Sequence, residues 1–303
     1  MTSKSKIALI GLSGESVFMK VDHFHTTGET IKAKEIHIEP GGKGYNQAVA
    51  IAKLGGEPYL LSMVGDDYYG KICEDYLIDH GVKSYLHKHT HLKTAFASIL
   101  TDQLGENQVT VFPGAANELS AQTVEGFEET IKKCAALLVT FEVPLPALYK
   151  AIELAKKHHV LVILNPAPAI IDDIIKQCDI ITPNEVEART IFGLAHHLPI
   201  DEIIPLVLES DFKRVVITLG KNGCLLFDNQ AVKKIPSVKV KAIDTTGAGD
   251  IFNAALTVGI TKGWNFETAV KFANQIAAFS VTKKYVMKAI ESFNEIDFQN
   301  FLK

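Results

Sequence analysis

The sequence lacks the usual marks of secreted and membrane-spanning chains. Its four cysteines, Cys73, Cys134, Cys178 and Cys224, show no Cys-x-x-Cys spacing, which favours reduced thiols in the cytosol. The apolar run at residues 7–12 is too short for a signal peptide or a membrane span. A net charge of −4 argues against binding to nucleic acid or to a membrane surface. We therefore expect a soluble cytoplasmic protein.

What the sequence has is enough apolar material for a large core. Apolar residues make up 47% of the 303 residues and charged residues 22%, and neither a repeat nor a linker interrupts the chain. From about residue 120, apolar runs alternate with helical stretches such as residues 145–157; the runs cover residues 135–140, 160–164, 180–182 and 215–219. Such alternation predicts βαβ units and a mainly parallel sheet with helices on both faces.

The first third of the chain shows a second pattern. Residues 31–39 alternate apolar and polar side chains, and residues 17–21, 94–102 and 107–112 behave similarly. This period of two predicts strands with one solvated face. We expect a small sheet, a lid, built from about residues 15–39 and 93–112. Around it, residues 7–11 and 59–64 are predicted as buried strands, and residues 46–54 and 68–79 as helices.

The stretch from Asp244 to Asp250, DTTGAGD, runs directly into an apolar helical segment. A glycine-rich turn that opens a helix presents unpaired N–H groups and the positive end of the helix dipole, which suits phosphate or developing negative charge. A carboxylate at Asp250 beside such an anion hole is placed to take a proton from a hydroxyl. Alternatively, Asp250 only caps a helix.

A second glycine-rich stretch, GGKGYNQA, spans residues 41–48 and also precedes a predicted helix. It is no Walker loop, because Gly-Lys-Ser/Thr does not follow at the required spacing, and protein-kinase signatures are absent. Gly41 and Gly42 could form a plain turn after Pro40. Their position after a lid strand favours a binding loop, in which Lys43 and Asn46 offer polar contacts.

These two motifs, with NPAPA, TPNEVEA and ITLGKNG in order between them, resemble the ribokinase (PfkB) family of carbohydrate kinases over almost the whole chain. The resemblance implies an α/β fold, a ribokinase-like three-layer sandwich with a mainly parallel central sheet and a small β-sheet lid. Residues 1–303 would then form one kinase domain. It also implies an ATP-dependent transfer of the γ-phosphate to a hydroxymethyl group of a small sugar, with ribose as the default.

The resemblance also implies roles for individual residues. Asp250 resembles the catalytic base, and Gly247, Ala248 and Gly249 the anion hole. Sugar-contacting positions correspond to Gly14, Ser16, Gly42, Lys43, Gly44, Asn46 and Glu142. Positions that hold ATP correspond to Asn184, Thr218, Gly220, Lys221, Gly223, Gly249 and Asn274. Asn184 and Glu187 match the Asn-x-x-Glu that organises Mg²⁺ through water, while Asp244 and Thr246 match part of a potassium site. In this family the lid often makes a homodimer contact.

The sequence departs from the family at two places. The family carries an Asn and an Asp that grip sugar hydroxyls where this chain has Gly14 and Ser16. We expect vacated space there and a best substrate other than plain ribose. The family's potassium site uses a glycine and a serine where this chain has Tyr285 and Ala289, so we expect weaker activation by potassium.

Several alternatives stay open. His87, His89 and His91 alternate, which would suit a metal site on a strand, but a solvated surface is the ordinary meaning of three histidines without a carboxylate. Lys283, Lys284 and Lys288 are expected on a solvated face, and contact with nucleotide phosphates is the alternative. The substrate could be another sugar or a nucleoside. A non-catalytic sugar sensor is the alternative from another class, although a sensor needs no base beside an anion hole.

Overall fold

The computed structural model describes residues 4–104 and 106–295. The ends of the predicted domain and residue 105 of the predicted lid lie outside the described residues. Within this part, nine strands form the central sheet: β1 (Lys6–Ile10), β4 (Glu57–Gly65), β5 (Lys83–His89), β8 (Ala136–Thr140), β9 (Leu161–Asn165), β10 (Ile180–Ile181), β11 (Arg214–Thr218), β12 (Cys224–Asp228) and β13 (Ala231–Ile235). Their order is β13-β12-β11-β10-β9-β8-β1-β4-β5.

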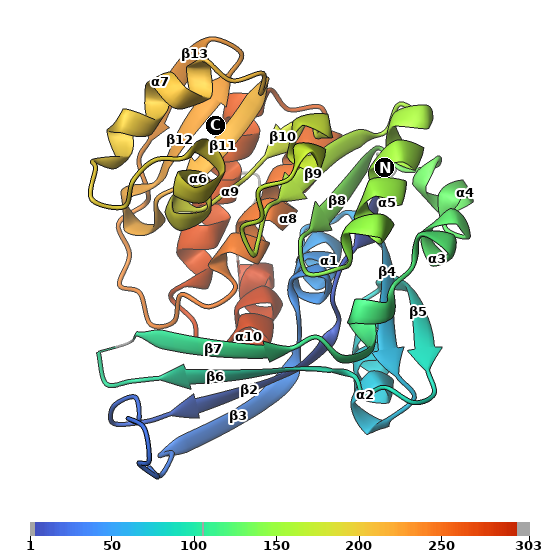
Figure 1. Cartoon of the computed structure of the whole chain (residues 1–303), viewed down its shortest axis with the longest axis vertical. Helices are drawn as coiled ribbons and strands as arrows, with labels where there is room; N and C mark the ends of the chain where they lie inside the picture. Colours follow the sequence, from blue (N-terminus) through green and yellow to red (C-terminus); the bar gives the residue numbers. More distant parts are fainter. Residues whose placement is uncertain (1–3, 105, 296–303) are drawn as a thin grey trace.

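All pairs from β5 to β11 are parallel, as the strand–helix alternation predicts, and only the pairs β11–β12 and β12–β13 are antiparallel. Ten α-helices among the described residues connect the strands: α1 (Lys43–Lys53), α2 (Tyr68–Asp79), α3 (Ala121–Glu125), α4 (Glu128–Ile131), α5 (Leu145–Lys157), α6 (Glu185–Phe192), α7 (Ile203–Leu208), α8 (Ala248–Thr261), α9 (Phe266–Ser280) and α10 (Val286–Glu291). The predicted three layers are therefore present (Figure 1).

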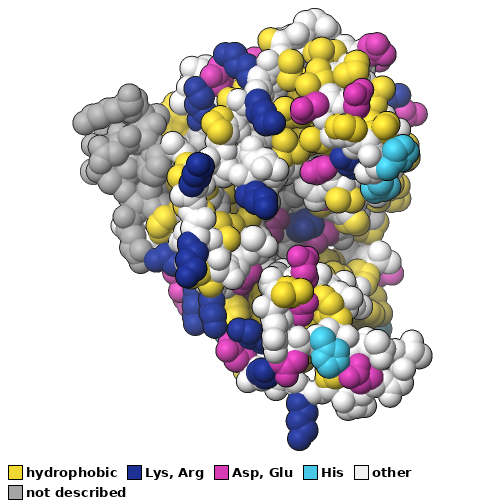
Figure 2. Space-filling model, turned by 90° about the vertical axis from the view of Figure 1, so that its left-hand side faces the viewer, with side chains coloured by type: hydrophobic (Ala, Val, Ile, Leu, Met, Phe, Trp, Pro, Cys, Tyr) yellow, Lys and Arg dark blue, Asp and Glu magenta, His cyan; other side chains and the backbone are white. Residues whose placement is uncertain are grey.

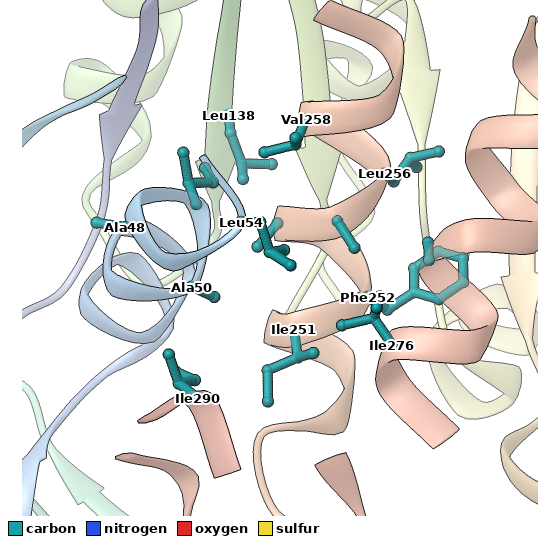
Figure 3. Close-up of a cluster of buried hydrophobic side chains, with 14 of the residues drawn as sticks. Ala48, Ala50, Leu54, Leu138, Ile251, Phe252, Leu256, Val258, Ile276 and Ile290 are labelled. Carbon is teal, nitrogen blue, oxygen red and sulfur yellow. The ribbon is translucent and has the colours of Figure 1, made fainter. Parts of the chain in front are cut away.

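The central strands are apolar on both faces because each face is covered by helices. Along β1, Ile7 and Leu9 join a cluster with α1, α8 and α9, while Ala8 and Ile10 join a second cluster with α5. Figure 3 shows the first cluster, in which Ile251 and Phe252 of α8 lie between α1 and α9. Burying one such Leu or Ile contributes about 1.5–3 kcal/mol relative to leaving it exposed. This packing fixes α1 beside α8, and both helices carry residues of the site.

A separate sheet of four strands, here called the lid sheet, lies below the central body in Figure 1. It consists of β2 (Gly14–Lys20), β3 (Glu35–Gly41), β6 (Ala95–Thr101) and β7 (Asn107–Phe112), in the order β3-β2-β6-β7. The bounds of β2 and β3 differ from the predicted ones. β2 begins three residues earlier, and β3 begins later and continues into Gly41, because these two strands pair over their whole length.

Three strands of the described chain were not predicted as such. The hairpin β12–β13 extends the central sheet beyond β11, and the outer strand β13 is mostly exposed and carries two lysines, which hides the strand signal. Strand β5 forms the other edge, with alternating exposed side chains. As edge strands, β5 and β13 lack the continuous apolar run by which the inner strands were recognised, because solvent reaches part of their surface. This reason does not apply to β12, which lies one strand further in and carries the buried run CLLF.

Candidate active site

The N-terminus of α1 is held against the end of β1 by glycines. A Cβ on Gly44 would lie 2.6 Å from the Gly11 Cα, and Gly42 has a φ of 101° and would place a Cβ 2.6 Å from the Leu12 carbonyl oxygen. A side chain at either position would push the helix away from the strand. GGKG is therefore a close backbone approach, and it aims Lys43 and Asn46 at α8.

Asp250, in the first turn of α8, is the residue on which these side chains converge. Asn46 donates to Asp250 Oδ2 at 2.8 Å, and Gln47 donates to Oδ1 at 3.2 Å. The Gln47 amide also donates to Asn165 Oδ1 at 3.2 Å. Asp250 is 5% exposed. Its carboxylate is thus oriented by two amides that come from a helix more than 200 positions earlier in the sequence.

Glu142, which follows β8, joins the same group from another strand end. Its Oε2 accepts a hydrogen bond of 2.8 Å from the backbone N–H of Lys43. Because β8, β9 and β10 are parallel neighbours, Glu142, Asn165 and Asn184 all lie at the carboxyl edge of the sheet. Ligands of open α/β sheets bind at this edge.

The three charged groups shift one another's ionisation. Burial raises the pKa of Asp250, while the positive charge of Lys43 and the amides of Asn46 and Gln47 oppose this rise. Burial raises the pKa of Glu142 to about 7, again against the charge of Lys43. The Asp250 carboxylate raises the pKa of Lys43. A carboxylate whose pKa is raised by burial accepts a proton more readily than an exposed one, and the charge of Lys43 offsets part of this effect.

A cavity of about 190 Å³ lies directly in front of Asp250. Gly247, Gly249, Lys43 and Glu187 line it, among others. Gly247 has a φ of 73° and is the N-cap residue of α8, where it offers no side chain to cap the helix. The first turn of α8 therefore faces the cavity with its positive dipole end.

A larger cavity of about 760 Å³ adjoins the first. Its walls contain every residue assigned to ATP by the resemblance, namely Asn184, Thr218, Gly220, Lys221, Gly223, Gly249 and Asn274. The two cavities share Asn184, Thr218 and Gly249. In Figure 2 the molecule is hollowed between the body above and the lid sheet below, and Lys and Arg side chains lie beside this hollow.

Asn184 and Glu187 form a capping box at the start of α6. Asn184 Oδ1 accepts from the Glu187 N–H at 2.9 Å, and Glu187 Oε2 accepts from the Asn184 N–H at 2.8 Å. Burial raises the pKa of Glu187. Each carboxylate oxygen retains a second lone pair, and both residues line the smaller cavity. The pair fits a hydrated Mg²⁺ that is held by few protein ligands and by substrate phosphates.

The predicted potassium site around Asp244 and Thr246 lacks the hydroxyl that the family places where this chain has Ala289. Asp244 Oδ1 accepts from the Thr246 N–H, and Oδ2 accepts from the Tyr285 N–H, both at 2.9 Å. Ala289 supplies no hydroxyl. Tyr285 nevertheless has φ 63° and ψ 152°, a conformation found almost only in glycine. The tyrosine thus keeps a glycine-like backbone, which the sequence did not predict.

Gly14 and Ser16 lie at the base of the lid sheet, on the strand next to Gly41. The expectation of vacated space at Gly14 was wrong. A Cβ there would collide with the carbonyl oxygen of Ala95 and lie 2.8 Å from the Ala95 Cβ, because β6 closes onto β2. Ser16 is buried against Gly41, on the side where Asn46 Oδ1 lies.

The histidines do not gather into a metal site. His87 and His89 belong to β5, whereas His91 lies beyond it and donates its backbone N–H to His89 Nδ1 at 3.1 Å. In the described ranges, no group of three His, Cys, Asp or Glu side chains is arranged to hold a metal ion. Nor does any described helix have the length and apolar character for crossing a membrane.

Sequence reasoning missed three polar residues of the site, Gln47, Thr182 and Asn253. Asn253 Oδ1 accepts from the Thr182 hydroxyl at 2.5 Å. Asn253 Nδ2 donates to the Gly249 carbonyl at 2.9 Å and so supports the glycine loop. A buried amide in the midst of apolar helix residues was the available signal for Gln47 and Asn253, but their partners lie mainly on other elements.

The model of the "pfkB family carbohydrate kinase" matches residues 4–292. This chain belongs to that family. It is 33% identical to the ribokinase of Haemophilus influenzae over 297 residues, which cover 96% of this chain and 97% of the relative. It is 32% identical to the deoxyribokinase of Salmonella typhi, with 95% and 97% covered. The structure of Arabidopsis thaliana ribokinase complexed with ribose and ATP superposes with a TM-score of 0.82 at 25% identity, covering 95% of this chain and 99% of that one.

Membership in the pfkB family confirms the resemblance predicted from the motifs. It also confirms the predicted fold class and the predicted sugar kinase activity. The chain is a ribokinase-like sugar kinase, that is, a phosphotransferase with an alcohol group as acceptor. A family of kinases disfavours the alternative of a non-catalytic sugar sensor.

Proposed function

We propose that this chain uses ATP and Mg²⁺ to phosphorylate the hydroxymethyl group of a small sugar, with ribose as the default substrate. One observation carries the proposal: Asp250 lines the small cavity, which joins the larger, nucleotide-sized one. A base in this position faces a sugar hydroxyl from one side and a terminal phosphate from the other.

In the proposed reaction, Asp250 takes the proton of the sugar hydroxyl while the hydroxyl oxygen attacks the γ-phosphorus of ATP. The bond from this phosphorus to the bridging oxygen breaks, and ADP leaves. Asn46 and Gln47 orient the Asp250 carboxylate through their amides. The N–H groups at the start of α8 stabilise charge on the transferring phosphoryl group. Mg²⁺ near Asn184 and Glu187 would neutralise charge on the phosphates.

On the sugar side, we assign Glu142, Asn46 and Ser16, with the backbone of Gly42 to Gly44, to the hydroxyl groups. Asn46 Oδ1 is a buried acceptor without a hydrogen-bond partner among the described residues. An unsatisfied buried acceptor costs about 1–3 kcal/mol, and a sugar hydroxyl would remove this cost. We treat the chain as one kinase domain whose lid sheet covers the sugar.

A second candidate substrate is deoxyribose. Ser16 stands where the family has a carboxylate that binds sugar hydroxyls. A substrate with one hydroxyl fewer therefore loses less binding free energy in this site than in a site that keeps the carboxylate. A hydrogen bond to a charged group contributes about 1.5–3 kcal/mol. The 32% identity to a deoxyribokinase is consistent with this candidate.

An assay of ADP release tests these assignments. It contains ATP, Mg²⁺ and one compound from a panel of ribose, deoxyribose, other sugars and nucleosides. We expect turnover with a pentose, and ³¹P–¹H NMR of the product should show the phosphate on its hydroxymethyl oxygen. Turnover with nucleosides alone would contradict the sugar assignment. A ribose KM typical of ribokinases, with no better substrate in the panel, would contradict the departure from plain ribose.

We also propose a homodimer through the outer face of the lid sheet. This face carries Ile36, Ile38 and Phe112, which are 65%, 54% and 53% exposed. Register places Ile38 beside Val17 and Ile36 beside Met19, so these apolar side chains share one face. Sedimentation of the full chain and of Ile38→Glu tests the proposal: a dimer that Ile38→Glu dissociates supports it, and a monomer at micromolar concentration contradicts it.

A further inference from the structure

The inner face of the lid sheet is joined to the segment that supports the glycine loop. The joint consists of His37 and Glu39 on β3 and of Tyr285 and Val286 at the start of α10, and is here called the lid joint. Figure 1 shows α10 between the lid sheet and the central body. None of these four residues lines the 190 Å³ or 760 Å³ cavity.

Tyr285 makes the aromatic part of the lid joint. Its ring stacks on the imidazole of His37, with centroids 3.7 Å apart and planes 17° from parallel. The ring of Phe18, from β2, meets Tyr285 edge-on at 5.5 Å. Aromatic contacts of this kind are favourable beyond the area they bury. The ring of Tyr285 is thus held by two strands of the lid.

Glu39 makes the polar part. Its Oε1 accepts hydrogen bonds from the backbone N–H groups of Val286 and Met287, at 2.9 Å and 3.3 Å, and its Oε2 lies 3.0 Å from His37 Nε2. Glu39 is 7% exposed. A lid residue therefore caps the helix that follows Tyr285, and the same residue holds the histidine on which Tyr285 stacks.

The other side of the lid joint touches the glycine loop. The Tyr285 N–H donates a hydrogen bond to Asp244 Oδ2, and the Thr246 N–H donates one to Asp244 Oδ1. Val286 packs on Gly247, since a Cβ on that glycine would lie 2.7 Å from both Val286 methyl groups. Tyr285 also holds a backbone conformation that costs free energy in any residue but glycine. Such a conformation persists where the surroundings impose it, and here the surroundings include the ring contacts with the lid and the hydrogen bond to Asp244.

We propose that Tyr285 is a positioning residue that transmits closure of the lid sheet to the glycine loop. The loop from Thr246 to Gly249 takes its catalytic shape when His37 and Glu39 hold Tyr285 and Val286 against Asp244 and Gly247. This proposal rests on the proposed roles of the lid and of the glycine loop. It differs from them in assigning the coupling to residues that touch neither substrate.

Substitutions of Tyr285 separate the ring from the backbone. Tyr285→Phe keeps the stack on His37, and we expect kcat within about 3-fold of wild type. Tyr285→Gly suits the backbone conformation but removes the ring, so we expect kcat to fall ~10–100-fold, the range set by a misplaced catalytic group. The KM for ATP should change little, because the large cavity is intact. Wild-type kcat in Tyr285→Gly would overturn the proposal, since the backbone alone would then suffice.

His37→Ala removes the partner of the stack from the lid side. We expect its effect on kcat and that of Tyr285→Gly to be strongly non-additive in the double variant, because both break one contact. Lys284→Ala is the matched control: Lys284 pairs at 3.2 Å with Glu35, which lies on the same strand as His37, but both side chains are about half exposed. It should leave kcat unchanged. Additive effects of His37→Ala and Tyr285→Gly would overturn the coupling.

Hydrogen exchange gives a readout that requires no turnover. In His37→Ala, without substrates, we expect the amides of residues 246–249 to exchange at least about 10-fold faster than in wild type, with α8 beyond its first turn unchanged. Unaltered exchange in these amides would overturn the proposal. If the wild-type chain phosphorylates no sugar, the proposed function fails, while the exchange measurement still decides the coupling.

Discussion

Replacing Asp250 by Asn is the sharpest test of the proposed chemistry. The amide has nearly the shape of the carboxylate but cannot take the proton of the sugar hydroxyl. Loss of a general base costs about 10²–10⁴-fold in rate. Since each decade is about 1.4 kcal/mol, the activation barrier should rise by about 3–5 kcal/mol.

The fold should tolerate this substitution, for a reason visible in the site. In wild type, both Asp250 oxygens accept from amide donors, at 2.8 Å from Asn46 and 3.2 Å from Gln47. In Asp250→Asn, the new NH₂ group would face one of these donors, a conflict of about 1–3 kcal/mol. Turning the Asn46 amide presents its Oδ1, which lacks a partner among the described residues, to the new NH₂ group. Removing a buried carboxylate offsets part of the remaining cost.

Three measurements on Asp250→Asn follow. Urea unfolding should give a free energy of unfolding within about 1 kcal/mol of wild type, ADP binding by calorimetry should be retained, and ADP release with the best sugar should fall ~10²–10⁴-fold. Asp172→Asn is the control, since Asp172 caps a short 3₁₀ helix and lines neither cavity of the site. A turnover number for Asp250→Asn within a few-fold of wild type would refute the assignment of the base.

Further predictions concern pH, packing, cations and the sugar. Burial raises the pKa of Glu142 from 4.5 to about 7, so the folded state binds more protons than the unfolded chain between these values, and its stability falls as pH rises from about 4.5 to 7. The loss is about 1–3 kcal/mol, allowing for the partial exposure of Glu142, and unfolding of Glu142→Gln should show a shallower pH dependence; equal slopes would refute this. Gly14→Ala should cost about 1–3 kcal/mol because its Cβ meets Ala95, while Gly126→Ala, with only one neighbour at 3.4 Å, should be nearly neutral; equal urea midpoints would contradict the packing. Exchanging sodium for potassium should raise kcat only weakly, and a strong, saturable rise would contradict the expected loss of a ligand at Ala289. Ser16→Asp should improve the KM for ribose more than that for deoxyribose, and the opposite order would exclude Ser16 from hydroxyl recognition.

The sequence predicted the architecture well where local patterns carry the information. Continuous apolar runs identified β8, β9, β10 and β11, because strands buried on both faces need apolar residues at every position. Glycine motifs identified the starts of α1 and α8. The edge strands β5 and β13 were missed because solvent reaches part of their surface and interrupts the apolar run. Strand β12 was missed although it carries the buried apolar run CLLF.

For the site, the residues assigned to ATP line one cavity, and Asn46 and Asp250 are hydrogen-bonded. The motifs therefore determined which residues meet at the carboxyl edge of the sheet. Their catalytic roles remain predictions for the variants above. The sequence could not supply Gln47 as a second donor to Asp250, because an amide among apolar helix residues marks Gln47 as unusual but does not show that its partner lies on α8.

By itself, the sequence determined the βαβ succession, the two glycine-opened helices and the family, because these depend on residues close together along the chain. Only the tertiary structure decided that Gly14 leaves no space and that Glu39 caps α10, contacts that join separate strands or residues 247 positions apart. It also decided that Tyr285 keeps a glycine-like backbone under the lid. Periodicity fixes which face of a strand is buried, whereas the partner on that face is chosen by packing between elements, and packing is a property of the folded chain.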